Sequence, residues 1–558
     1  MKLTSGTLLL FFATHCMAEV DLNMVNRIRA EGLHQSEVMH TLQHLTDLIG
    51  PRLSGSPQMK QANEWTRDKL QEWGLEETHL EAFEFGWGWT YDSASVDLLT
   101  PRKTSLHGIP VAWTPATNGA VEGEVVYVDA VTEEELEQYR SKLRGKVVLL
   151  TPLRDFSEPR NEVFQRLTAK ELKELGEFNV MRGPSHRRAP SASQDRGIQA
   201  RKFRWVLSKF LANEGAMAAL QPSYRDGGLI NVFGFDHQPE RTFSVPVLVL
   251  EAEHHSLLHR LLDLGETPTV SIDIQAQFHD DDSNAYNTLG EIPGTKKKPE
   301  IVMTGAHLDS WHASTGAVDN AAGVAITMEA MRILSVLDVK PKRTIRIALW
   351  SGEEQGLFGS YQYVRSHFAT RPLPENPDER SLPRWMWRSP GWPITTLPDY
   401  DRFSAYFNLD NGSGRIRGIY TEGNAAVKPI FSSWFGPFSD LSAGTVVLRA
   451  TGGTDHESFD DVGLPGFQFI QDGLDYSSRL HHTHIDSYDH AVEGDMKQAS
   501  TILAAFLYNA ATMEKRMPRE VMPARPTAIS DLDSAREARK ARRAREREAK
   551  RSLDMLPE

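Results

Sequence analysis

The chain has 558 residues, of which 40% are hydrophobic and 25% are charged, and its formal net charge at pH 7 is -13. This length exceeds what one hydrophobic core usually serves, so we predict an ordinary globular protein with at least two domains. The negative net charge argues against a protein that binds nucleic acid by general electrostatic attraction.

The first eighteen residues have the pattern of a secretory signal. Lys2 precedes the apolar stretch Leu8 to Ala13, and small residues precede a cut after Ala18. We therefore expect a secreted or periplasmic protein that begins near Glu19 and has no transmembrane span. An N-terminal buried helix is the alternative.

Cys16, the only cysteine, lies within this predicted signal. It also resembles a bacterial lipoprotein site, but His15 stands where that pattern has a small residue. Without other cysteines the mature chain has no disulfide and no thiolate metal site, so any metal must be bound by His, Asp and Glu.

The rest of the chain contains four segments that differ in the spacing of their apolar residues. Residues 35–75 are helical in pattern, with a Pro/Gly/Ser turn from Gly50 to Pro57. Short β-type runs such as Val125 to Val128 follow from about residue 120 to residue 275, and the charged residues 155–203 among them predict a surface excursion. Strands and helices alternate over 300–515. The Arg-, Lys- and Glu-rich residues 530–552 predict an exposed helix, with contact to anionic lipid or nucleic acid as the alternative.

Three apolar runs in the second half end in side chains that bind metals. Residues 301–306 precede His307, residues 345–350 precede Ser351-Gly352-Glu353-Glu354, and residues 403–409 precede Asp410. Each run predicts a buried strand with a polar tip. In open α/β sheets the ligand crevice lies beyond the carboxyl ends of the strands, so these tips can converge. We therefore predict a metal hydrolase.

Two further carboxylates have more than one interpretation. Asp309 lies on the same side of an extended segment as His307 and can accept its free ring N–H, as carboxylates beside metal-bound histidines do. A structural histidine at a strand end is the alternative. Asp319 precedes a predicted helix, where it can either cap the helix or bridge two cations.

Glu353 and Glu354 form an adjacent pair at the end of a buried strand. Neighbouring side chains point in different directions, so one can bind a metal while the other acts as a general base; an exposed acidic turn is the alternative. Three histidines, His481, His482 and His484, cluster near Asp486, and the pattern leaves open which imidazole binds a metal.

Together these motifs resemble the co-catalytic zinc exopeptidases, the family of aminopeptidase Y, glutamate carboxypeptidase and carboxypeptidase Q, with most similarity to the carboxypeptidase Q branch. The likeness covers residues 276–515 and, with fewer matches, residues 35–115. Residues 119–275 resemble an inserted protease-associated domain through Leu143 to Leu150 and Asn213 to Ala216. The matching motifs are GAHLDSW (305–311), GAVDN (316–320), WSGEEQG (350–356), NLD (408–410), TDH (454–456) and HTHID (482–486).

The resemblance implies a role for each of these residues. His307 and Glu354 would hold one of two zinc ions, Asp410 and His482 the other, and Asp319 would bridge them. Glu353 would be the general base, with Asp309 as the second catalytic residue through His307. Asp455 and His456 would line the substrate site, or serve a structural hydrogen-bonding role.

Two positions depart from the family pattern. Aminopeptidases of the family often have a tyrosine shortly before the Asp-His pair, where this chain has Thr451-Gly452-Gly453-Thr454, so the protein donor to the oxyanion is unassigned. His312 replaces an acidic residue that follows Asp-Ser-Trp in the most similar branch.

We thus expect an α/β fold, a mixed sheet between helices, in a secreted dizinc exopeptidase that hydrolyses dipeptides or short peptides and forms homodimers as its relatives do. A single-zinc glutaminyl cyclase and a non-catalytic receptor-like binding protein are the alternatives. The expected boundaries are a signal peptide (1–18), the N-terminal part of the peptidase lobe (19–118), the protease-associated domain (119–275), the catalytic lobe (276–520) and a charged tail (521–558).

Overall fold

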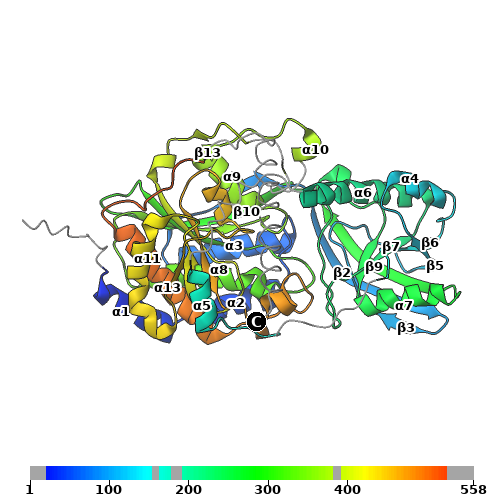
Figure 1. Ribbon diagram of the computed structural model, residues 1–558, viewed down its shortest axis with the longest axis horizontal. Helices are drawn as coiled ribbons and strands as arrows, with labels where there is room; N and C mark the ends of the chain where they lie inside the picture. The colour runs from blue at the N-terminus through cyan, green and yellow to red at the C-terminus, as the bar shows by residue number, and fades with distance from the viewer. Residues whose placement is uncertain (1–19, 154–162, 178–191, 381–386, 388–390, 524–558) are drawn as a thin grey trace, which may run out of the picture.

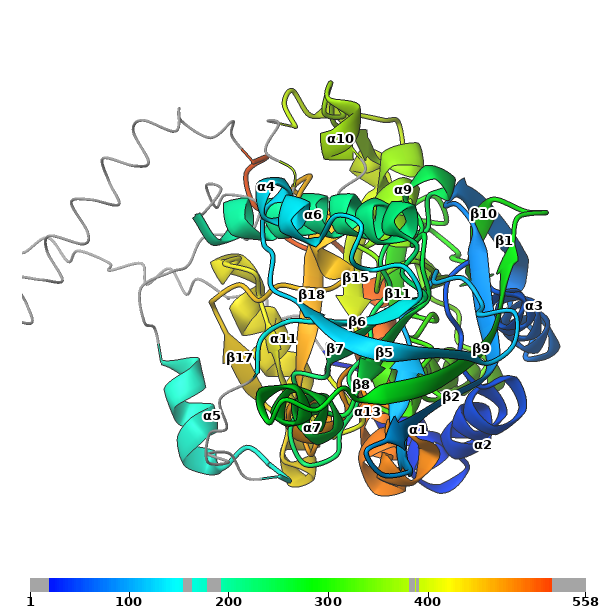
Figure 2. The same cartoon turned by 90° about the vertical axis from the view of Figure 1, so that its right-hand side faces the viewer.

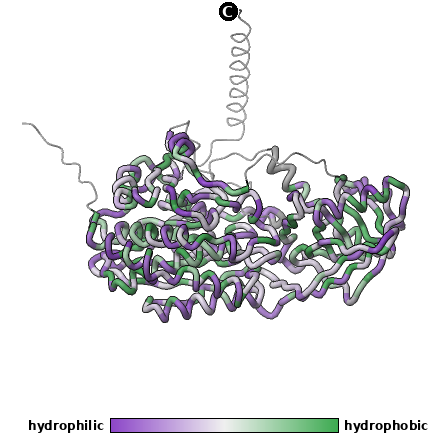
Figure 3. The backbone as a smooth tube through the Cα atoms, turned by 90° about the horizontal axis from the view of Figure 1, so that it is seen from below, coloured by the Kyte–Doolittle hydropathy of each residue, from purple (hydrophilic) through white to green (hydrophobic). Residues whose placement is uncertain are grey.

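The computed structural model describes residues 20–153, 163–177, 192–380, 387 and 391–523 (Figure 1). These residues form two lobes that lie side by side along the long axis of the molecule (Figures 1 and 3). The predicted signal peptide and the residues of the charged tail beyond 523 lie outside the described residues. In the described part of the chain, no helix is long and apolar enough to cross a membrane.

The first lobe is built on an eight-stranded mixed sheet. Its central strands β12, β11, β15 and β18 are parallel, and antiparallel pairs flank them. The strands in spatial order are β1 (Glu76–Glu84), β10 (Asn284–Ile292), β12 (Thr344–Trp350), β11 (Ile301–His307), β15 (Phe403–Asn408), β18 (Gly466–Gln471), β16 (Ile416–Tyr420) and β17 (Thr445–Val447).

The three apolar runs of the sequence are the adjacent strands β12, β11 and β15, which confirms the prediction of buried strands. Every residue of β11 and of β15 is buried. Their register pairs Gly305 with both Ala348 and Asn408. The polar residues that come after the strands therefore leave the same edge of the sheet.

Helices cover both faces of this sheet, as a mixed α/β sandwich predicts. Along β11, Val302 and Ala306 pack with the first group of helices, whereas Met303 packs with the second. The first group is α1 (Leu22–His34), α2 (Val38–Gln43), α3 (Pro57–Glu72), α8 (Ala322–Val336), α11 (Lys428–Phe435) and α13 (Glu493–Thr512); the second is α9 (Phe358–His367) and α12 (His456–Asp460). The fold class is thus the one that the sequence predicts.

The second lobe contains another eight-stranded sheet, whose strands β5 to β8 are parallel. The helices α4 (Glu133–Leu136) and α6 (Ala192–Glu214) contribute to one of its two apolar clusters, and α7 (Ala252–Asp263) to the other (Figure 2). The strands in spatial order are β3 (Thr104–Leu106), β2 (Gly88–Thr100), β9 (Thr269–His279), β5 (Val121–Val128), β6 (Lys146–Leu150), β7 (Ala218–Pro222), β8 (Val247–Leu250) and β4 (Gly108–Pro110).

The change from one sheet to the other does not fall at the expected residue 118/119. It lies between β1, which pairs in the first sheet, and β2, which pairs with β9 in the second. Strand β2 mixes polar and apolar residues, and β3 and β4 have three residues each, whereas β5 and β6 contain continuous apolar runs. The sequence pattern therefore did not show where the second sheet begins.

The expected surface excursion over 155–203 is not a loop throughout. It contains α5 (Ala169–Gly176) and the first part of α6. Before α5 the chain returns to the first lobe, where Gln165 and Leu474 exchange two backbone hydrogen bonds of 2.9 Å. Arg166 there forms ion pairs with the buried carboxylates of Asp472 and Asp495, at 3.1 and 2.5 Å. Residues 184–191 lie outside the described residues.

Candidate metal centre

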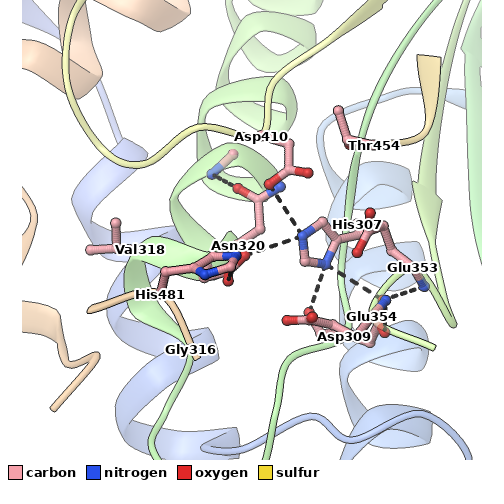
Figure 4. A network of polar contacts seen from close by, with 12 residues as sticks. His307, Asp309, Gly316, Val318, Asn320, Glu353, Glu354, Asp410, Thr454 and His481 are labelled. Carbon is pink, nitrogen blue, oxygen red and sulfur yellow. Dashed lines mark hydrogen bonds and ion pairs between the residues drawn. The ribbon is translucent and has the colours of Figure 1, made fainter. Parts of the chain in front are cut away.

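Five candidate metal-binding residues of the sequence meet at the carboxyl edge of the first sheet. Figure 4 shows His307, which ends β11, beside Asp410, which follows β15, and Glu354, which follows β12. Asp319 lies in the short turn Ala317–Ala321 before α8, and His482 follows the turn Tyr476–Leu480. The parallel strands thus bring together residues that are up to about 175 positions apart, as expected for an open α/β sheet.

The distances divide these residues into two groups that share Asp319. In the first group, Nε2 of His307 lies 3.3 Å from Asp410 Oδ1 and 3.4 Å from Asp319 Oδ1. In the second group, Nε2 of His482 lies 2.9 Å from Glu354 Oε2 and 3.2 Å from Asp319 Oδ2. Asp319 therefore directs one oxygen toward each imidazole, as a bridging carboxylate does.

This grouping differs from the pairing expected from the resemblance, in which His307 goes with Glu354 and Asp410 with His482. The distances favour it over the expected pairing. Strand β15 lies directly beside β11, which places Asp410 against His307. Glu354 follows β12 on the other side of β11 and faces His482.

Asp319 does not cap the helix that follows it. The amide oxygen of Asn320 instead accepts the Gly323 N–H at 3.1 Å. The backbone N–H groups of Val318 and Asp319 donate to Asp486 at 2.7 and 3.0 Å. Asp486 thereby holds the turn so that the Asp319 carboxylate remains directed at the two imidazoles.

Asp309 connects His307 to the pair of glutamates. Nδ1 of His307 lies 3.0 Å from the backbone oxygen of Asp309 and 3.6 Å from its carboxylate, so the carbonyl is the nearer ring partner. The carboxylate accepts the backbone N–H groups of Glu353 and Glu354, both at 3.3 Å (Figure 4). Asp309 therefore orients both an imidazole and the turn that carries the glutamates.

Two residues of the turn from Gly50 to Pro57 support this arrangement, although the sequence pattern gave them only the role of a linker. Ser54 Oγ donates to Asp309 at 3.0 Å and accepts the Gly352 N–H at 2.8 Å. Arg52 is fully buried and donates to five backbone carbonyls, among them Leu308 at 2.8 Å and Gly316 at 2.9 Å. A charged residue inside a predicted turn was the only sequence signal for this role.

The two imidazoles are held as cations when no metal is bound. Burial opposes this, but the carboxylates of Asp410 and Glu353 outweigh it and raise the pKa of His307 well above its usual value. Burial also opposes protonation of His482, yet Glu354 and Asp319 raise its pKa to about 10. Positive charge at these two positions thus offsets the buried carboxylates.

The glutamates have high proton affinity. Burial raises the pKa of Glu353 well above its usual value, with Asp410 and Asp455 adding to the effect although His307 opposes it. Burial and Asp319 raise the pKa of Glu354 to about 7, against the opposing effect of His482. A carboxyl group with a raised pKa beside a metal-binding cluster is suited to accept and return a proton.

Divalent cations fit this cluster. Glu354 Oε1 is a buried acceptor without a hydrogen-bond partner. The three carboxylates lie 2.9 to 3.4 Å from the two imidazoles. Buried carboxylates are costly unless cations neutralise them. Two divalent ions, bound by oxygen and nitrogen ligands that suit zinc, would supply that charge.

Among the clustered histidines, His482 is the one placed against both Asp319 and Glu354. His481 stacks on it at a ring distance of 3.6 Å, and its Nε2 lies 4.0 Å from Asp319. His484 is directed elsewhere, because its Nδ1 accepts the Ile230 N–H at 3.0 Å. These distances favour His482 over its two neighbours.

The second lobe supports the loop of His482, a contribution that no sequence pattern signalled. His482 has a φ of 60°, and its carbonyl accepts the Val232 N–H at 3.1 Å and the Asn231 amide at 3.3 Å. The ring of Phe233 lies edge-on to His482 at 5.0 Å. With Trp311 of the first lobe, Phe233 forms an apolar wall beside the metal-binding residues.

Asp455 and His456 are both completely buried. Asp455 lies within electrostatic range of His307 and Asp410, and burial raises its pKa to about 7. His456 Nε2 lies 3.7 Å from the buried Glu422.

His312 lies at the junction of the two lobes. Its Nε2 donates to the carbonyl of Pro110 in β4 at 2.7 Å, and its ring packs edge-on against Trp89 and Tyr91. Burial lowers the pKa of His312 to about 4, so the ring stays neutral. His312, which departs from the family pattern, thus connects the two lobes.

Comparison with known proteins assigns this architecture to a family. Residues 287–507, which include the strand tips and all five candidate ligands, match the model of peptidase family M28. Human carboxypeptidase Q is 26% identical over 491 residues, which cover 88% of each chain. Aminopeptidase YwaD of Bacillus subtilis is 26% identical over 251 residues, 44% of this chain and 49% of that protein.

These matches support the resemblance to the family M28 peptidases. Solved structures agree with this family M28 fold. A peptidase M28 precursor from Shewanella amazonensis superposes with a TM-score of 0.63 at 22% identity, over 90% of this chain and 99% of that one. A zinc aminopeptidase from B. subtilis gives a TM-score of 0.53 at 17% identity, over 86% and 96%. The family match and the similarity to carboxypeptidase Q support a zinc-dependent exopeptidase.

Proposed function

We propose that this chain is a secreted dizinc exopeptidase of family M28 that cleaves dipeptides or the terminal residues of short peptides. The observation that carries the proposal is the division of the ligands into two groups around Asp319. One group contains His307 and Asp410, the other His482 and Glu354. A single-metal cyclase would need only one such group.

Glu353 is the group we assign as general base. When bound, the two zinc ions would lower the pKa of a shared water toward about 7 and polarise the scissile carbonyl. Glu353 would accept a proton from the attacking water and return it to the leaving amine, as its raised pKa suits. Asp309 would keep the turn of Glu353 in place through the hydrogen bond that it accepts from the Glu353 N–H.

Tyr476 is the protein group that we assign to the developing oxyanion. A β-carbon built at Gly412, two residues after Asp410, would lie 3.2 Å from Tyr476 Cβ. The Tyr476 ring lies 5.1 Å from the ring of His481. Burial and the nearby carboxylates of Asp319 and Asp410 raise the pKa of Tyr476 well above its usual value. Its hydroxyl thus remains a hydrogen-bond donor at neutral pH.

Short substrates are supported by the wall beside the metal-binding residues. Trp311 and Phe233, from different lobes, pack edge to face at 5.6 Å next to His482. An extended chain that passed straight through the site would have to separate these rings, whereas a chain terminus would not. Secretion rests on the signal pattern that ends at Ala18.

Metal content and cleavage of a small substrate panel together test the proposal. Zinc equivalents per chain would be measured on the protein that begins at Glu19, beside turnover of free dipeptides and of amino-terminal amides. We expect at least two zinc equivalents and cleavage that a chelator abolishes. A single equivalent with cyclisation of amino-terminal glutamine would favour the cyclase, and the absence of any turnover would contradict the proposal.

A further inference from the structure

A second group of side chains that could bind a metal lies on the second lobe. His107 follows β3, Glu251 follows β8, and His254 lies in the first turn of α7 (Figure 1). One potential ligand atom from each of the three lies within 4.8 Å of the other two. No step of the proposed peptidase reaction uses these residues.

The scaffold that carries these side chains is rigid. Strand β4 pairs with β8, so that Gly108 lies opposite Leu250. The Glu251 N–H donates to the carbonyl of His107 at 2.9 Å, which extends this pairing to the two candidate ligands. His254 is three residues after Glu251 on a helix, and residues at this spacing lie on one face.

The distances between the ligand atoms suit a tetrahedral ion. Glu251 Oε2 lies 3.2 Å from His107 Nδ1 and 3.6 Å from His254 Nδ1. Nitrogen and oxygen ligands lie about 2.1 Å from zinc, so tetrahedral geometry separates them by roughly 3.4 Å. An ion could thus enter once the His254 ring turns its Nδ1 away from the His107 backbone N–H.

Glu251 is positioned for this role rather than for capping a helix. It occupies the residue before α7, yet its side chain makes no capping hydrogen bond. Its carboxylate instead turns toward the two imidazoles and is mostly shielded from solvent, with 18% of the side chain exposed. A simple surface ion pair of this kind contributes little to stability, so stability alone does not account for the arrangement.

The hydrogen bonding of His254 also suits a ligand. Its Nδ1 accepts the His107 N–H at 2.9 Å, which places the lone pair on the atom nearest Glu251. Metal binding would replace this hydrogen bond, and because the N–H is at the surface, water can take it over at small cost.

We propose that His107, Glu251 and His254 form a binding site for a divalent transition-metal ion, with zinc as the natural occupant and water at the open position. Two imidazoles and one carboxylate are a common zinc ligand set. The site borders Gly228, where an added β-carbon would lie 3.7 Å from Glu251. The chain continues from there to Val232, which donates to His482, so the site adjoins the segment that supports the active-site loop.

Metal counting on matched variants tests this site. The wild-type chain, the double variant His107→Ala/His254→Ala and the control His79→Ala, which removes an exposed histidine from β1, would be loaded with zinc, desalted and analysed by mass spectrometry for metal per chain. We expect the double variant to hold one zinc equivalent fewer than the other two and to retain dipeptidase turnover. Equal zinc content in all three proteins would overturn the proposal.

A second variant guards against a folding defect. Glu251→Gln preserves the shape of the side chain but removes the anionic ligand, and its fold would be checked by circular dichroism. In a titration with zinc we expect the affinity of one site to fall by at least about tenfold, whereas unchanged binding would overturn the proposal. Because the readout is the difference between proteins, it does not depend on whether the active site holds one ion or two.

Discussion

The two eight-stranded sheets share a parallel centre but differ in the residues just beyond the ends of their strands. In the first sheet, β11, β12 and β15 lead into buried ionisable residues, so that His307 and Asp319 have 1% and 4% exposure. In the second sheet the strands enclose two apolar clusters, and the side chains of Glu251 and His254, which come after β8, are partly exposed. The first lobe therefore concentrates buried charge at its strand ends, whereas the second lobe rests mainly on apolar packing.

The largest expected effect concerns the group that handles the proton. Glu353→Gln should lower kcat by about a thousandfold while bound zinc is retained, because it removes the proton acceptor and no ligand. Steady-state kinetics and metal analysis would measure the two quantities. The exposed Glu84 of β1 offers a control, since Glu84→Gln should leave kcat unchanged. An active Glu353→Gln enzyme would show that another residue is the base.

Removal of the metal should affect the two lobes differently. Without cations, Asp319, Glu354 and Asp410 face one another in a buried site, and each ion present at about a hundred times its Kd contributes about 3 kcal/mol to stability. Hydrogen exchange after treatment with a chelator should therefore increase in Ile301–His307 of β11. The strand Val121–Val128 of β5 is the internal reference, and equal increases in both strands would contradict the difference between the lobes.

The junction between the lobes should weaken in acid. The folded-state pKa of His312 is about 4, below the unfolded value of about 6.5, so the unfolded chain binds the proton more tightly. Stability should accordingly fall as the pH drops from 6.5 toward 4, by about 2 kcal/mol for this residue between pH 7.5 and 5. Urea unfolding at the two pH values measures this loss, and His312→Gln should reduce it. An unchanged pH dependence in His312→Gln would exclude this residue as the cause.

The smallest expected effect distinguishes two serines in one turn. Ser54→Ala removes a hydrogen bond to Asp309 and should reduce kcat by about fivefold, since one such bond contributes about 1 kcal/mol. Ser56 caps α3 through a 3.1 Å bond to the Met59 N–H, so Ser56→Ala should cost about 1 kcal/mol of stability and leave kcat intact. Kinetics and thermal unfolding of both variants test this contrast, and equal kcat values would remove Ser54 from the supporting role.

Much of the first sheet could be predicted because its central strands are long apolar runs with abrupt polar ends. His307 and Asp410 are visible as strand tips for this reason. Their pairing could not be predicted, since it depends on the spatial order β12, β11, β15, which no local pattern encodes. The same limit applies to the change of sheet after β1, because pairing with distant β9 decides where β2 belongs.

The supporting residues could not be predicted for a related reason. Arg52 binds backbone carbonyls, and any loop provides such carbonyls regardless of its sequence. Asn231 and Val232 likewise contact the carbonyl of His482, which leaves no trace in the residues themselves. Side chains that bind metals have a recognisable chemistry, whereas side chains that hold those ligands in place do not.

Because the second lobe supports His482, loss of that lobe would affect the metal-binding residues of the first. A left-handed backbone is unfavourable for a histidine, and here the strand-rich insert supplies the two hydrogen bonds that hold it. A gene that lost the insert would still encode all five candidate ligands, yet the last of them would be free to leave its position. In truncated relatives, a complete set of ligand codons is therefore insufficient to infer a working enzyme.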